Sequence, residues 1–146
     1  MKLTKTNHIK ASQSGMTLLE LTVVILVLLS LISILFIGAR AWKRGSDRAA
    51  SILMIRNVQQ AVRSNANMSG LNAADAMDPT DIFGSGKFIE TNPTTETHPA
   101  GSDFTWTILA DSVVPEMGTL YLTVVGATVD DDPAYYMPDD DDILNW

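Results

Sequence analysis

Glu20 is the residue whose type and position could do the most unusual chemistry in this chain. Its carboxylate stands at the start of a stretch with no other charged residue before Arg40. Sixteen Leu, Ile, Val and Phe residues occur between Leu18 and Ile37, so the stretch is almost entirely apolar. An ionisable group inside such a segment is costly and normally pairs with another polar group. The sequence therefore indicates a functional carboxylate that needs a partner.

Two aspartate clusters near the C-terminal end form a second group with potential chemistry, because hard cations such as calcium prefer carboxylate oxygens. The clusters are Asp130–Asp132 and Asp139–Asp142. The candidate calcium ligands are Asp130, Asp132, Asp139 and Asp140. Consecutive aspartates cannot all face one ion, and no spacing here matches an EF-hand loop. A solvated, partly disordered acidic tail is therefore the favoured alternative, and we expect no other cofactor.

Few other residues suit catalysis. The histidines are His8 and His98, and we find no nucleophile motif, phosphate-binding glycine loop or pair of histidines with metal-ligand spacing. The chain has no cysteine, which excludes disulfides, thiol catalysis and cysteine-based zinc sites. We therefore expect a protein that is not an enzyme.

The charge is distributed unevenly along the chain. Residues 1–15 carry +3 from three lysines, residues 16–64 carry +4 from six basic and two acidic residues, and residues 65–146 carry −14 from one lysine and fifteen acids, which sum to −7. Phosphate contacts need a basic surface, so we expect no nucleic-acid binding by the acidic part.

The apolar stretch behind Glu20 has the length of a membrane-spanning helix. The nineteen residues from Leu21 to Ala39 make about 28 Å of helix, close to the roughly 30 Å of a hydrocarbon core. Its apolar residues favour insertion by roughly 5–10 kcal/mol, whereas a mid-membrane Asp, the nearest available proxy for Glu20, costs about 2.5–3.5 kcal/mol. We expect the helix to insert despite the acid.

The residues before the stretch resemble a known processing site. A short basic leader precedes the run Gly15-Met16-Thr17-Leu18-Leu19-Glu20, which opens the apolar segment. This order of features resembles the N-terminal segment of type IV prepilins and type II secretion pseudopilins. Many members have Phe where this chain has Met16, and a proline late in the apolar run where this chain has Ile37-Gly38.

The resemblance implies a role for three residues. A membrane peptidase would cut after Gly15 and methylate Met16, and the Glu20 carboxylate would pair with the N-terminal amine of a neighbouring subunit. The implied partners are further copies in a helical filament, other pilin-like subunits, prepilin peptidase, an assembly ATPase and a platform protein. The implied location is the bacterial inner membrane, single-pass, with a periplasmic or extracellular head. Some pseudopilins also bind calcium near the C-terminus.

The N-terminal segment has two other interpretations: a cleaved secretory signal peptide, which is the weaker one, and an uncleaved signal anchor, which stays open. A secretory signal peptide has a shorter apolar region, although Ala39-Arg40-Ala41 resembles its cleavage site. An uncleaved signal anchor that carries an extracytoplasmic binding or scaffolding domain, outside any filament, is the competing function. Positive charges flank the apolar stretch on both sides, so they do not decide its orientation.

The rest of the chain predicts a helical stem followed by a β-rich head. From Ala49 to Ser64 a helical pattern predicts one buried stripe and an opposite polar side, and the helix should end between Asn65 and Gly70. The stripe comprises Ala50, Met54, Ile55, Val58, Ala61 and Val62, and the polar side comprises Arg56, Gln59, Gln60 and Arg63. The expected strands are Lys87–Glu90, Phe104–Leu109 and Leu120–Val125, with a surface loop over Asn92–Ser102.

We therefore expect an α+β fold, in which a long N-terminal helix packs on a small antiparallel sheet, as in pilins. The expected divisions are a removed leader (1–15), an apolar assembly helix (16–41), an amphipathic stem (42–68) and a head with an acidic C-terminal tail (69–146).

Overall fold

The fold is α+β and is dominated by one helix. The structure is a computed structural model that describes residues 17–109, 112–126, 128 and 131–144. Its longest element is α1 (Leu18–Ser69), and its sheet consists of β1 (Phe104–Ile108) and β2 (Leu122–Gly126). The short helices are η1 (Pro79–Asp81), η2 (Pro93–Thr95), η3 (Pro133–Tyr136) and α2 (Asp140–Ile143). The chain forms two compact units, Met1–Ala39 and Arg40–Trp146.

The N-terminal unit contains the apolar part of α1. Every residue from Leu18 to Ala39 is exposed. The hydroxyls in this part donate to backbone carbonyls one turn back: Ser30 to Val27 and Ser33 to Leu29, both at 2.8 Å. Such bonds satisfy polar groups inside the helix itself, as an apolar solvent requires. Among the described residues, α1 is the one helix long and apolar enough to cross a membrane.

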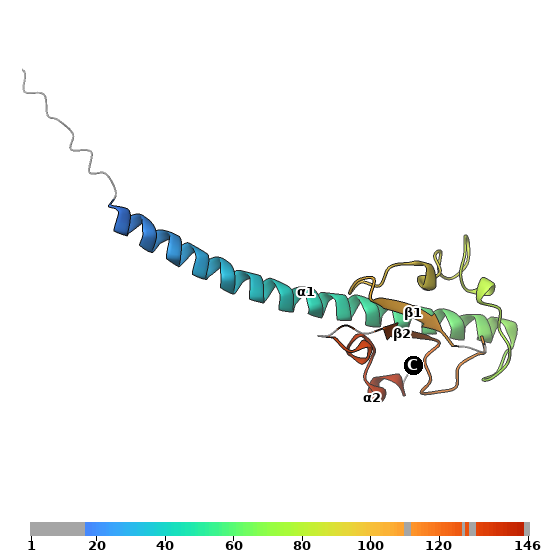
Figure 1. The fold of residues 1–146 in the computed structure, drawn as a ribbon. Helices are drawn as coiled ribbons and strands as arrows, with labels where there is room; N and C mark the ends of the chain where they lie inside the picture. Colours follow the sequence, from blue (N-terminus) through green and yellow to red (C-terminus); the bar gives the residue numbers. More distant parts are fainter. Residues whose placement is uncertain (1–16, 110–111, 127, 129–130, 145–146) are drawn as a thin grey trace, which may run out of the picture. The chain divides into compact units, whose positions relative to one another are not determined.

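The C-terminal unit is built on the last part of α1, which Figure 1 shows beside β1 and β2. One face of this helix is buried in a single hydrophobic core with the inward side chains of both strands. The core residues from the helix are Ile55, Val58, Ala61, Val62 and Ala66, and those from the strands are Phe104, Trp106, Leu122 and Val124. Each buried side chain of the size of Val, Ile or Phe stabilises the fold by roughly 1.5–3 kcal/mol. The predicted stripe is thus confirmed at its centre.

Two assignments on the stem were wrong. Ala50 is exposed, because the core begins about one turn later on this face. Gln59, expected on the polar side, is buried at 2% exposure. Its amide donates to the carbonyl of Thr119 at 3.1 Å and accepts from the backbone N–H of Tyr121 at 3.0 Å. A polar side chain can therefore be part of the core when a loop offers it both a donor and an acceptor.

The helix ends where the sequence predicted. Gly70 follows the last helical residue with φ of +70°, and the N–H of Leu71 bonds to the carbonyl of Ala66 at 2.9 Å. This six-residue closure around a left-handed glycine is a Schellman motif.

The sheet is a two-stranded antiparallel ribbon. Its register pairs Phe104 with Gly126 and Trp106 with Val124, so side chains of both strands alternate between core and solvent. The strand predicted over Phe104–Leu109 is confirmed as β1, and β2 starts two residues later than the predicted Leu120–Val125. The strand predicted over Lys87–Glu90 was wrong: this segment is a turn, and Ile89 makes only an isolated bridge to Phe83.

Candidate functional site

Glu20 lies in the first turn of α1, which Thr17 caps. Thr17 immediately precedes the helix, and its Oγ1 accepts from the backbone N–H of Glu20 at 3.3 Å. The carbonyl of Thr17 accepts the N–H of Leu21 at 3.1 Å. Thr17 is therefore the N-cap and Glu20 the third helical residue, in the Thr-x-x-Glu order of a capping box.

In this position the carboxylate of Glu20 can stabilise the start of the helix, and it is also accessible to a partner outside the chain. An acidic side chain in the first turn interacts favourably with the helix dipole. Glu20 is exposed, and the side chains around it, Leu18, Leu19 and Leu21, are exposed and apolar. The site is therefore a carboxylate surrounded by the exposed apolar side chains of a helix. The two processing residues predicted beside it, Gly15 and Met16, lie outside the described residues.

A second polar site lies at the start of the C-terminal unit, where basic residues of α1 meet acids of the C-terminal segment. Arg44 Nη2 pairs with Asp131 Oδ1, and Arg48 Nη2 lies 3.5 Å from Asp139 Oδ1. Both guanidinium groups lie over the ring of Tyr135, at 4.5 Å and 5.2 Å from its centroid. The acidic segment is thus held against the stem by charge pairs and cation–π contacts.

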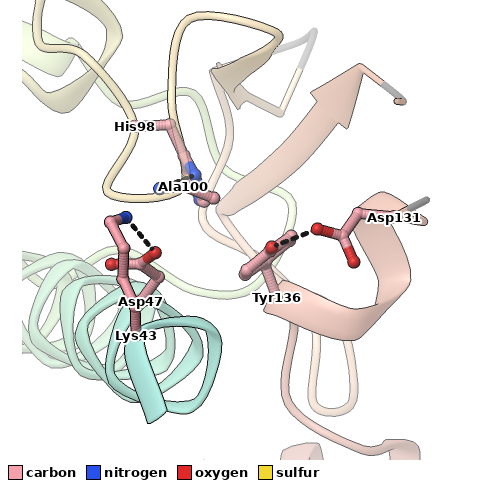
Figure 2. A network of polar contacts seen from close by, with 6 residues as sticks. All are labelled: Lys43, Asp47, His98, Ala100, Asp131 and Tyr136. Carbon is pink, nitrogen blue, oxygen red and sulfur yellow. Dashed lines mark hydrogen bonds and ion pairs between the residues drawn. The ribbon is translucent and has the colours of Figure 1, made fainter. Parts of the chain in front are cut away.

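Tyr136 connects the same acidic segment to the core, as Figure 2 shows. Its hydroxyl donates to Asp131 Oδ2 at 3.0 Å, and its ring is 2% exposed. Burial, followed by the hydrogen bond to Asp131, raises the pKa of Tyr136 above its usual value near 10. The hydroxyl therefore stays protonated and acts as a donor. On α1, Lys43 Nζ pairs with Asp47 Oδ2 at 2.6 Å.

His98 is the centre of a buried network that the sequence did not predict. It was expected in a surface loop, but it is 2% exposed and lies among the rings of Phe104, Trp106 and Tyr136, with centroids 4.6–5.6 Å away. The Thr- and Pro-rich composition of the loop hid this burial. Two aromatic residues spaced by two in the following strand are the signal that could have indicated a stacking partner.

The hydrogen bonds fix the protonation state of His98. The backbone N–H of Ala100 donates to Nδ1 at 3.1 Å (Figure 2), so this nitrogen carries no proton. The proton of the neutral ring is then on Nε2, which donates to Ser51 Oγ at 3.1 Å, and Ser51 donates to the carbonyl of Tyr136 at 2.7 Å. Burial lowers the pKa of His98 below its usual value near 6.5, and the charge of Asp47 offsets this only in part.

The hydrogen bond between Ser51 and His98 has the opposite direction to the one that a catalytic serine and histidine form. A catalytic imidazole must accept the hydroxyl proton of the serine. Here the imidazole donates to the hydroxyl, and Ser51 is fully buried. The pair therefore joins α1 to the loop of His98 and to η3.

Of the four candidate calcium ligands, the structure describes Asp132, Asp139 and Asp140. Asp132 Oδ1 caps η3 by accepting the N–H of Ala134 at 2.8 Å, and Asp139 faces Arg48. Asp140 lies in the first turn of α2, and Asp130 lies outside the described residues. Within the described ranges, no group of three or more His, Cys, Asp or Glu side chains is placed to hold a metal ion. Within the described residues of the acidic tail, Pro133–Tyr136 form η3 and Asp140–Ile143 form α2, and Asp139–Asp142 are exposed to solvent.

No protein-family model, curated protein or solved structure matches this chain.

Proposed function

We propose that this chain is a structural subunit of a helical filament, a type IV pilus or a type II secretion pseudopilus. One observation supports this most strongly: Glu20 is an exposed carboxylate in the first turn of an exposed apolar helix. The apolar surface requires lipid or other apolar helices around it, and in either environment the charge requires a partner.

The partner that this proposal supplies is the N-terminal amine of a second copy. Cleavage between Gly15 and Met16 would create an amine about one helical turn before Glu20 in each copy. Opposite charges attract more strongly in a low-dielectric filament core than in water, and an unpaired charge would oppose any other stagger of the helices. The pair would then set the register between copies.

The C-terminal unit fits the role of a filament head. Ser51 of α1 bonds both to His98 and to the carbonyl of Tyr136, and the Gln59 amide bonds to the loop at Thr119–Tyr121, so several segments of the head are fastened to α1. These bonds hold the head on the part of α1 that belongs to the same unit. Prepilin peptidase, an assembly ATPase, a platform protein and other pilin-like subunits are the partners of this proposal, and the inner membrane is its starting location.

Intact mass and N-terminal sequencing of the membrane-extracted chain test the processing. In a host with active prepilin peptidase we expect a chain that starts at N-methylated Met16. A host that lacks the peptidase is the control and should yield a chain that starts at Met1. If the leader is retained in both hosts, the proposal is wrong and the uncleaved signal anchor is the better account.

A further inference from the structure

The basic residues that follow the apolar stretch line a pocket at the start of the C-terminal unit. Its volume is about 420 Å³, and its lining includes Arg40, Lys43 and Arg44 from α1 and Asp131 and Tyr136 from the C-terminal segment. Helix positions three and four residues apart lie on one face, so the three cations point the same way. We propose that this pocket binds the phosphate of an anionic phospholipid.

The position of the cations along the helix favours a lipid headgroup. Arg40 follows the nineteen-residue apolar stretch directly. The rise from Arg40 to Arg44 is about 6 Å, which matches the roughly 5–8 Å of polar headgroup region on each side of the hydrocarbon core. Trp42, in the same turn, is 78% exposed, as suits an aromatic side chain at a membrane interface. The inference rests on the membrane residence of α1 that the proposed function includes.

The basic side chains of the pocket have N–H donors that a phosphate can accept from. Arg40 takes part in no ion pair in the part of the chain that the structure describes. Lys43 pairs with one carboxylate oxygen of Asp47 at 2.6 Å while its side chain is 67% exposed, and an ammonium has three N–H donors. The side chain of Arg44 pairs with Asp131 and is 45% exposed.

The two acids position the cations and do not cancel them. Asp47 and Asp131 each hold one long basic side chain at the pocket. Because these side chains are already ordered, they lose less conformational entropy when a ligand binds. Three cations against two carboxylates leave the pocket with one net positive charge. A phosphodiester, which carries one negative charge and only acceptor oxygens, matches that balance.

Native mass spectrometry of the full chain, extracted from membranes in detergent, tests this site. Phosphatidylglycerol is the probe, phosphatidylcholine the zwitterionic comparison, and glycerol 3-phosphate the soluble phosphate ester. We expect one retained phosphatidylglycerol per chain, bound at least fivefold more tightly than phosphatidylcholine. Arg40→Gln and Lys43→Gln should each weaken that binding about fivefold, because one cation near a membrane surface contributes about that factor. The control Arg56→Gln, an exposed cation three turns beyond the pocket, should leave it unchanged.

The outcomes separate this inference from the proposed function. A chain recovered only in the soluble fraction would overturn both. A membrane-bound chain that retains both lipids equally, or that loses phosphatidylglycerol as much in Arg56→Gln as in Arg40→Gln, would overturn the site alone. Glycerol 3-phosphate that binds as tightly as phosphatidylglycerol would show a site for a soluble phosphate ester, and the lipid assignment would be wrong.

Discussion

Ser51 Oγ and His98 Nε2, 47 residues apart in the chain, lie 3.1 Å from each other in the core of the C-terminal unit. The two hydrogen bonds of His98 together require a neutral imidazole, because Nδ1 accepts the N–H of Ala100 while Nε2 donates to Ser51. Protonation would place two donors against each other at Nδ1 and bury a charge among three aromatic rings. The bond from Ala100 to His98 and the burial of the imidazole therefore depend on pH.

The first prediction concerns stability in weak acid. Burial lowers the pKa of His98 in the folded chain, so the unfolded chain takes up the proton first as the pH falls. The stabilisation is complete above the unfolded pKa near 6.5 and is lost as the pH falls toward the folded pKa. Urea unfolding of the full chain in detergent, followed by tryptophan fluorescence, should show a slope below pH 6.5 of up to about 1.4 kcal/mol per pH unit.

Substitutions identify the group that is responsible. His98→Gln should lower the free energy of unfolding at pH 7.5 by roughly 1–3 kcal/mol and remove the slope between pH 5 and 6.5. The other histidine provides the control, since His8→Gln in the full chain should leave the slope intact. A slope that survives in His98→Gln would mean that another group titrates.

The second prediction concerns the buried amide of Gln59. Gln59→Leu keeps the approximate volume but leaves the carbonyl of Thr119 and the N–H of Tyr121 without their partner. Two buried unsatisfied groups should cost roughly 2–5 kcal/mol, measured as a lower urea midpoint with an unchanged slope. Gln60→Leu, at the exposed neighbouring position, is the matched control and should change the free energy of unfolding by less than about 0.5 kcal/mol. Equal effects of the two variants would refute the role of Gln59.

The third prediction concerns the end of β2. Gly126 has φ of +116°, and a Cβ there would run into the carbonyl of Asp103 and approach the Cα of Phe104 to 3.1 Å. Gly126→Ala should destabilise the chain by roughly 2–5 kcal/mol, from backbone strain and steric overlap together. Gly86→Ala, with φ of +76° but open space around it, should cost only the strain, about 1 kcal/mol. Thermal unfolding of both variants measures the difference, and a Gly126→Ala variant no less stable than Gly86→Ala would contradict it.

The elements with strong periodicity were predictable from the sequence. The stem places Ile55, Val58 and Val62 at helical spacing, and β1 alternates Phe104 and Trp106 with threonines. Each pattern indicates its own secondary structure without information from the rest of the chain. The end of α1 at Gly70 was predictable for a different reason. A glycine readily adopts the left-handed conformation that stops a helix.

The failures occurred where a distant segment decides the outcome. Gln59 is buried because the loop at Thr119–Tyr121 offers it two backbone partners, and His98 is buried because Ser51 and Ala100 satisfy both of its nitrogens. The backbone partners of Gln59 leave no local pattern in the sequence, and the burial of His98 is indicated only by the aromatic pair Phe104 and Trp106 in the next strand. The Lys87–Glu90 segment has strand-like composition but finds no neighbouring strand among the described residues, so it forms a turn with one bridge.

The fourth prediction concerns calcium. The roles of Asp132 as a cap and of Asp139 as a partner of Arg48 commit two of the four candidate ligands to other contacts. We expect the melting temperature of the C-terminal unit, measured within the full chain, to be the same in 1 mM calcium and in excess chelator. A rise of several degrees in calcium that Asp132→Asn abolishes would establish a site that includes this aspartate.

The fifth prediction separates the two roles of Glu20. Glu20→Gln removes the charge but keeps an amide that can complete the capping box with Thr17, whereas Glu20→Ala removes both. Both variants should insert into the membrane, because the apolar stretch outweighs the carboxylate, and both should fail in assembly. A defect in Glu20→Ala alone would assign Glu20 to capping.

The proposed role of the Glu20 charge in holding neighbouring copies together is tested by the yield of sheared, pelletable filaments. Wild-type chain, Glu20→Gln and the control Glu116→Gln, an exposed carboxylate in the C-terminal unit, are expressed at equal membrane levels in the native host. We expect filaments from wild type and Glu116→Gln, and a filament yield at least tenfold lower from Glu20→Gln. Normal filament yield from Glu20→Gln would contradict that role.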